Sequence, residues 1–302
     1  MSSPLQPPAG RRTGLATLAL LGVTASWGST FFLIKDLLDR VPAVDFLALR
    51  FSIAAVALFV VAPGAVRRIS PGARRRGLAL GLVYGVAQIM QTIGLEHTAA
   101  SVSGFITGMY VVATPLLAGW LLHERIPAAV WAAVALSAAG LAVLSLRGLS
   151  VGPGELLTLA AAMLYAVHIV GLGAWSKAPD VYGLAVLQMA VIAVVAALPT
   201  AYDGITLPSR GADWAAVLYM ALVSGAMALL AQTWAQAHLP PTRAAIVMTT
   251  EPVFAAAFAV ALGGESFTGR MIVGGGLVLT AMYLVELAPR RKIEAEVPHL
   301  AQ

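Results

Sequence analysis

The sequence predicts an all-α integral membrane protein with ten transmembrane helices, arranged as two inverted five-helix repeats with both termini in the cytoplasm. Of its 302 residues, 59% are apolar and only 11% are charged, where a soluble domain carries roughly 25% charged residues. The mean hydropathy is +0.86. Long uncharged stretches follow one another along the chain, and positive charges gather on alternate loops. This composition excludes a water-soluble globule, and the absence of cysteine excludes disulfides and thiolate metal sites.

The ten predicted helices follow from the length of chain that a membrane requires. About 20 apolar residues cross a hydrocarbon core of roughly 30 Å. The stretches do not alternate between apolar and polar residues, so they are helices rather than barrel strands. Two stretches contain one charge each: Phe46–Ala62 with Arg50 and Ala244–Gly264 with Glu251. Eight contain none: Thr13–Ile34, Gly77–Leu95, Thr98–Leu122, Ile126–Leu146, Leu156–Ser176, Val181–Tyr202, Trp214–Ala237 and Met271–Val285.

The orientation follows from the distribution of lysine and arginine. The tails and the loops on their side carry 13 of these residues, the opposite loops carry 5, and Arg50 lies within a span. Because positively charged loops stay in the cytoplasm, both termini are expected there. The basic cluster at residues 67–76 is expected to lie along anionic membrane lipid. The net charge of +5 therefore indicates orientation and not a nucleic-acid partner.

Weak internal correspondences divide the chain into two halves. Since five spans is an odd number, the second half must insert upside down relative to the first, as in many secondary transporters. The expected units are a cytoplasmic tail at 1–12, repeats at 13–147 and 154–287, and a second cytoplasmic tail at 288–302. The matched residues are His97 with His238 and Glu124 with Glu265 at an offset of 141, and Trp27 with Tyr165 and Arg50 with Gln188 at an offset of 138.

Five short motifs, in order along nearly the whole chain, give it a family resemblance. They are Trp27-Gly28-Ser29-Thr30-Phe31 leading to Lys35, Leu49-Arg50-Phe51, Pro115 with His123-Glu124, Glu251-Pro252, and Gly264-Glu265. These motifs resemble those of the EamA-type members of the drug/metabolite transporter superfamily, and within it the chain is most similar to the YddG-like bacterial amino-acid exporters. The resemblance implies a ten-helix inverted-repeat fold with a central cavity. It also implies export of amino acids or similar metabolites across the bacterial inner membrane.

Four aromatic residues lie deep within predicted spans, although tryptophan and tyrosine usually concentrate at membrane interfaces. They are Trp27, Tyr84, Tyr110 and Tyr165. Such residues either line an amphipathic pocket for an aromatic or apolar substrate, or fill the core of the bundle.

Four uncharged polar residues also lie within spans. Gln88 and Gln91 follow Tyr84 along one helical face, His168 shares a face with Tyr165, and Gln232 is the deeper of two glutamines in the eighth span. Because polar groups facing lipid are costly, these side chains should point inward. They either bind substrate or hydrogen-bond to neighbouring helices, and His168 is also a candidate proton carrier.

Two charges and two prolines complete the set of candidate residues. A charge at the centre of a span costs on the order of 3 kcal/mol on insertion scales, so Glu251 needs a partner or a proton. It either couples transport to protons, binds a substrate ammonium, or is a structural group beside Pro252. Arg50 is a counter-ion by charge, but its predicted depth differs from that of Glu251. Pro115 and Pro252 each remove a helical hydrogen bond and are expected to break their helices beside the cavity.

Several function classes are excluded by missing motifs. The chain has no HExxH sequence, no P-loop and no paired intramembrane aspartates. We therefore expect neither an enzyme nor an ATP-driven pump, and we expect the chain to bind no metal, cofactor or nucleotide. The predicted function is a secondary transporter that exports amino acids, including aromatic and other neutral ones, and related metabolites by alternating access. Its expected partners are these small molecules and membrane lipid. The alternatives are an ion or small-solute channel and an exporter of a drug or metabolite that is not an amino acid.

Overall fold

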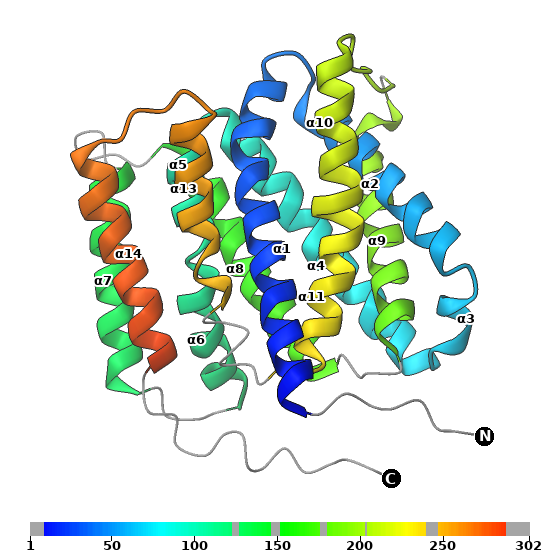
Figure 1. Cartoon of the computed structure of the whole chain (residues 1–302), viewed down its shortest axis with the longest axis horizontal. Coiled ribbons are helices and arrows are strands. Elements are labelled where there is room, and N and C mark those ends of the chain that lie inside the picture. Colours follow the sequence, from blue (N-terminus) through cyan, green and yellow to red (C-terminus); the bar gives the residue numbers. More distant parts are fainter. Residues whose placement is uncertain are drawn as a thin grey trace.

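A computed structural model of the chain describes residues 9–122, 127–145, 152–175, 180–202, 204–239 and 247–287. These residues form a bundle of helices without β-strands (Figure 1). Residues 1–8 and 288–302 of the two predicted tails, and the motif residues His123 and Glu124, lie outside the described part. The helices are α1 (Ala9–Leu38), α2 (Ala43–Val61), α3 (Ala65–Arg68), α4 (Pro71–Glu96), α5 (Ala100–Thr107), α6 (Tyr110–Leu122), α7 (Ala128–Ser145), α8 (Pro153–Trp175), α9 (Val181–Ala197), η2 (Leu198–Ala201), α10 (Gly211–Ala221), η3 (Leu222–Met227), α11 (Ala228–Gln236), α13 (Glu251–Ala261) and α14 (Gly269–Leu287).

The all-helical membrane architecture is confirmed in its main features. Among the described residues, seven helical stretches are long and apolar enough to cross a membrane. The helices α7, α13 and α14 are apolar as well, α13 being only 11 residues long, and they correspond to the fifth, ninth and tenth predicted spans. The outer surface is apolar as well: Val60, Val61 and Trp131 are among its exposed side chains, which suits contact with lipid. The number of ten spans stays a prediction.

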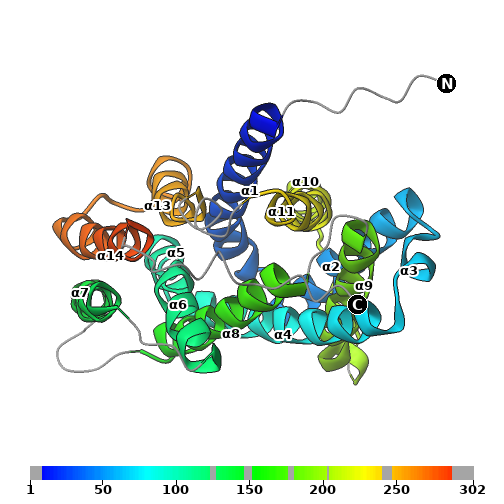
Figure 2. The same ribbon diagram turned by 90° about the horizontal axis from the view of Figure 1, so that it is seen from below.

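The helices of the two halves begin at matched positions. Ala43 begins α2 and Val181 begins α9, an offset of 138 residues, while Ala128 begins α7 and Gly269 begins α14, an offset of 141 residues. Matched helices run in opposite directions: α7 and α14 lie side by side and antiparallel (Figure 1 and Figure 2), and α4 rises where α10 and α11 descend (Figure 1). The first turn of α1 and the last turn of α14 lie at the same end of the bundle (Figure 1).

Two of the predicted spans are interrupted. A two-residue turn at 108–109 separates α5 from α6, and a turn at 249–250, offset by 141 residues, precedes α13. Pro115 is not the break expected from the sequence, because α6 continues through it. A proline ring removes one helical hydrogen bond, which a helix can tolerate inside a protein bundle. Pro252 does lie at an interruption, in the first turn of α13.

The predicted eighth span contains a feature that its sequence does not reveal. Between α10 and α11 the chain forms the π-helical segment η3. Such segments are rare and occur often at functional sites. Here η3 contacts α1 and α2, the two helices that begin the first repeat.

Close contacts without intervening side chains hold α13 against α1 and α5. A Cβ atom at Gly28 of α1 would lie 2.6 Å from the Cβ of Phe254 and 2.8 Å from the backbone nitrogen of Ala255. A Cβ at Gly104 of α5 would lie 2.5 Å from the Cβ of Ala255, and one at Gly108 would lie 2.5 Å from a ring carbon of Pro252. Small residues therefore place the first turns of α13 beside the turn at 108–109.

We expect Gly28→Ala to lower the melting temperature of the purified protein in detergent. The added methyl group would overlap the backbone of α13, and overpacking of this kind costs about 1–3 kcal/mol. Gly22→Ala on the same helix is the matched control, because no atom lies within 4 Å of a Cβ at that position. Equal melting temperatures for the two variants would contradict the contact.

Candidate functional site

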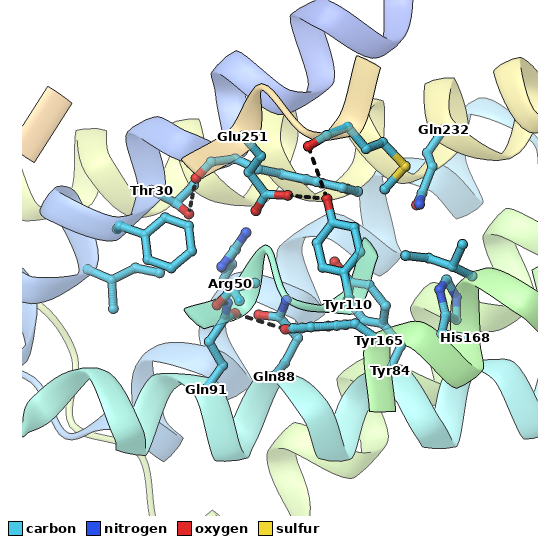
Figure 3. A pocket seen from close by; sticks show the side chains of 16 residues that line it. Thr30, Arg50, Tyr84, Gln88, Gln91, Tyr110, Tyr165, His168, Gln232 and Glu251 are labelled. Atoms are coloured by element: carbon cyan, nitrogen blue, oxygen red, sulfur yellow. Dashed lines mark hydrogen bonds between the residues drawn. The ribbon is translucent and has the colours of Figure 1, made fainter. Parts of the chain in front are cut away.

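Ten of the candidate residues line one cavity between the two repeats (Figure 3). They come from α1, α2, α4, α6, α8, α11 and α13. The cavity volume is about 40 Å³, enough for on the order of three water molecules at roughly 10–15 Å³ each. A larger ligand therefore requires the surrounding helices to move apart. The ten residues are Trp27, Arg50, Tyr84, Gln88, Gln91, Tyr110, Tyr165, His168, Gln232 and Glu251; Pro115 and Pro252 do not line the cavity.

The two interrupted spans meet at a hydrogen bond in this cavity. The hydroxyl of Tyr110, the first residue of α6, donates to Glu251 Oε2 at 2.9 Å and lies 3.3 Å from the carbonyl oxygen of Met248. Glu251 is the first residue of α13 and is buried. Tyr110 and Glu251 are 141 residues apart, so the bond joins equivalent positions of the two repeats. It satisfies one oxygen of a carboxylate that has left water.

A second polar network links α4, α5 and α8. The Tyr165 hydroxyl donates to Gln91 Oε1 at 2.8 Å, and Gln91 Nε2 donates to the Thr107 hydroxyl at 2.9 Å. The ring of Tyr84 stands edge-on to the rings of Tyr165 and His168, with centroids 5.4 Å and 4.9 Å apart. In this conformation Gln91 is therefore bonded to neighbouring helices, one of the two alternatives that its sequence position allowed.

His168 is fixed by a residue that sequence reasoning did not single out as a site residue. Its Nε2 lies 2.8 Å from Gln188 Oε1, and Gln188 Nε2 donates to the carbonyl oxygen of Leu184. Gln188 is fully buried on α9. The repeat offset of 138 pairs Gln188 with Arg50, and this equivalence is the signal in the sequence that could have identified it.

Arg50 is buried on α2 and is held by α10 and by aromatic rings. Its Nε donates to the carbonyl oxygen of Met220 at 3.0 Å. The guanidinium carbon lies 5.0 Å from the centre of the Phe51 ring and 5.9 Å from that of Phe46, distances that allow cation–π attraction. Within the described residues no ion pair joins Arg50 to Glu251, although both line the cavity.

Trp27 connects α1 to the π-helical segment. Its indole nitrogen donates to the carbonyl oxygen of Ser224 at 3.0 Å, and the hydroxyls of Ser26 and Ser224 lie 2.7 Å apart. Ser224 occurs within an apolar run of the sequence, and nothing in its local pattern distinguishes it. The ring of Trp27 therefore lines the cavity with its polar edge already bonded.

Two glutamines of the cavity are buried, and one of them has an unpaired oxygen. Gln88 and Gln232 are both buried, and the Oε1 atom of Gln232 has no hydrogen-bond partner among the described residues. A buried amide oxygen without a donor is unusual in a folded protein. The described residues contain no group of three His, Cys, Asp or Glu side chains that could hold a metal ion.

Comparisons with known proteins agree with this fold. The EamA-like transporter family model matches residues 14–146 and 152–287. An uncharacterized transporter of Archaeoglobus fulgidus is 28% identical over 276 residues, covering 91% of this chain and 85% of the relative. A probable terminal-alkyne amino-acid exporter of Streptantibioticus cattleyicolor is 26% identical over 297 residues, covering 94% and 97%. A protein of known crystal structure shares the fold, with a TM-score of 0.64 and 20% identity over 90% of this chain and 96% of that chain.

We expect a double-mutant cycle to detect the bond between Tyr110 and Glu251. Tyr110→Phe should destabilise the protein by about 1–3 kcal/mol, because the carboxylate loses a donor while it stays buried. In a Glu251→Gln background the same substitution should destabilise the protein less, because a hydrogen bond to a neutral amide oxygen is weaker than one to a carboxylate oxygen. Thermal unfolding in detergent measures both effects. An identical loss in the two backgrounds would show that the bond does not contribute.

Proposed function

Because the chain belongs to the EamA-like transporter family, we propose that it is a secondary transporter that exports amino acids and related small metabolites across the bacterial cytoplasmic membrane. The observation that carries the proposal is the cavity that both repeats line with aromatic and polar side chains. The names of its relatives also indicate a transporter and not an enzyme. One of them names an amino-acid exporter.

The lining of the cavity suits an aromatic or other neutral amino acid. The rings of Trp27, Tyr84 and Tyr165 provide an apolar wall with fixed orientation. Gln88 and His168 add polar groups between the rings. An amphipathic pocket of this kind binds a molecule with an apolar body and a polar head group.

Alternating access requires that the cavity open to one side of the membrane at a time. In the proposed mechanism the two inverted repeats rock against each other around the cavity. The cavity volume of about 40 Å³ is smaller than an amino acid needs, so in the proposed cycle the cavity widens when the repeats move. The turns at 108–109 and 249–250 are the positions at which the helices can bend.

The last turn of α1 and the first turn of α10 lie at the end of the bundle opposite to the first turn of α1 (Figure 1), and polar contacts join the two repeats there. Arg40, which follows α1, donates to both carboxylate oxygens of Asp213 in α10, at 2.7 Å and 3.2 Å. These bonds and those to Asp36 raise the pKa of the Arg40 guanidinium above its usual value. Asp45 accepts a hydrogen bond from the backbone nitrogen of Thr206. By the distribution of positive charge, this end faces the outside.

A carboxylate from the second repeat holds the start of α5 at the same end. Glu265 accepts hydrogen bonds from the backbone nitrogens of Ala100 and Ser101 and from the Ser101 hydroxyl. A negative charge at a helix N-terminus is favourable because the first backbone N–H groups have no partner within the helix. Together with the Arg40 pair, this contact keeps the outer end closed in the proposed cycle.

We expect the purified protein in proteoliposomes to catalyse saturable uptake and counterflow of phenylalanine and other neutral amino acids. Trp27→Ala should reduce phenylalanine uptake by about tenfold, and alanine uptake less, since the loss of an aromatic contact affects an aromatic substrate most. Trp131→Ala is the matched control, because Trp131 is exposed on the outer surface.

Other outcomes of this assay would identify the alternatives. Transport of no amino acid, with transport of another metabolite or drug, would exclude the proposed substrate class. Flux without saturation or counterflow would indicate a channel. The assay is run with and without a pH gradient, in the wild type and in Glu251→Gln and His168→Asn. If the pH gradient drives uptake only in the wild type, proton coupling is assigned to these residues. If uptake is the same with and without the gradient in all three proteins, the transporter is a uniporter.

We expect Asp213→Asn to favour opening of the outer end. The substitution removes the buried one of the two ionic partners of Arg40, and the loss of this ion pair should increase the open population by about three- to tenfold. The chain has no cysteine, so labelling of a single Ile34→Cys in the cavity wall with an impermeant maleimide reports access. Asp36→Asn is the control, because Asp36 is the exposed partner of Arg40. Unchanged labelling in both variants would contradict the closure by this pair.

A further inference from the structure

Three side chains that line the cavity each keep at least one polar atom for which the described part of the chain supplies no hydrogen-bond partner. The Arg50 Nε atom donates to a backbone carbonyl, but no acceptor is found for its two Nη nitrogens. Glu251 Oε2 accepts from Tyr110, and no donor is found for Oε1. The Oε1 atom of Gln232 is buried and has no donor. All three side chains line the same cavity (Figure 3).

Such a set is costly in the interior of a membrane-spanning bundle. Arg50 and Glu251 are 3% and 5% exposed, and a buried ion is costly when its hydrogen-bonding atoms are only partly satisfied. They have opposite charges and yet do not form an ion pair. Packing requirements alone do not call for a cation and an anion in one cavity with unused hydrogen-bonding atoms on each.

The unused atoms define a complementary ligand. The two Nη nitrogens of Arg50 form a fork that fits the two oxygens of a carboxylate. The free oxygens of Glu251 and Gln232 are acceptors, one charged and one neutral, and an ammonium group has three donors. A molecule that carries a carboxylate and an ammonium would therefore satisfy all three residues.

We infer that the cavity selects zwitterions: Arg50 binds the substrate carboxylate, and Glu251 and Gln232 bind the substrate ammonium. The inference rests on the proposed function and adds the chemical group by which the transporter recognises its substrates. The aromatic rings then contact whichever side chain the zwitterion carries. Selection by the head group explains how one cavity can accept several neutral amino acids and reject molecules with only one of the two charges.

The test compares phenylalanine with two analogues that each lack one charge. Phenethylamine lacks the carboxylate, and 3-phenylpropionate lacks the ammonium. In wild-type proteoliposomes we expect phenylalanine uptake to exceed uptake of either analogue by at least about tenfold, because each analogue leaves buried polar groups unpaired. Equal uptake of all three compounds would overturn the inference while the proposed transport of amino acids stands. Absence of phenylalanine uptake would instead overturn the proposed function.

Variants assign the two charges separately. Arg50→Gln should lower the ratio of phenylalanine to phenethylamine uptake by about tenfold and leave the ratio of phenylalanine to 3-phenylpropionate uptake unchanged. Glu251→Gln should lower the ratio of phenylalanine to 3-phenylpropionate uptake. These ratios do not depend on the amount of folded protein, since both compounds are measured on the same preparation. Arg50→Lys keeps the charge without the fork and should give an intermediate ratio. Unchanged ratios in all three variants would assign Arg50 and Glu251 a structural role only.

Gln232 has a matched control on its own helix. Gln236, one turn later on α11, also has a buried Oε1 atom without a partner, but it does not line the cavity. We expect Gln232→Leu to raise the apparent KM for phenylalanine by about three- to tenfold, and Gln236→Leu to leave it unchanged. The same KM in both variants would remove Gln232 from the binding site.

Discussion

The bond between Tyr110 and Glu251 is the interaction on which the arrangement of the bundle depends. A charge at the centre of a span costs on the order of 3 kcal/mol even on insertion scales, so the carboxylate must meet a donor inside the protein. The donor is supplied by the equivalent position of the other repeat, 141 residues away. For the two groups to meet, the interrupted spans must cross beside each other. The glycines that face α13 allow this approach because they add no side chain between the backbones.

The same requirement shapes the rest of the cavity. Polar side chains inside the bundle find partners on other helices, as in the bonds of Tyr165 to Gln91, His168 to Gln188 and Trp27 to Ser224. Each bond joins two different helices, so the network positions the aromatic rings around one space. Gln232 differs from these residues, because its buried Oε1 atom has no hydrogen-bond partner among the described residues.

Much of the fold could be predicted from the sequence, and less of the site. The length of the apolar stretches predicted the helices. The ten interior polar and aromatic candidates do line one cavity, because polar side chains that faced lipid would be costly. The position of the break in the fourth span was not predictable from Pro115, because the turn begins at Gly108, which lies against Pro252 of the other repeat. The π-helical segment η3 and the role of Ser224 were missed for the same reason, because the partners of Ser224 are 197 and 198 residues away in the sequence.

The sequence by itself determined the class of protein, its helical spans and the short set of polar residues that must avoid lipid. These properties depend on the transfer of each segment from water to hydrocarbon, which is local in the chain. Only the tertiary structure decided which of those residues pair with each other and which stay free. Gln91 is bonded to Thr107 and Tyr165, whereas Gln232 keeps an unpaired oxygen in the cavity. Hydrogen bonds require atoms within about 3 Å, and that proximity arises only when the two repeats pack together.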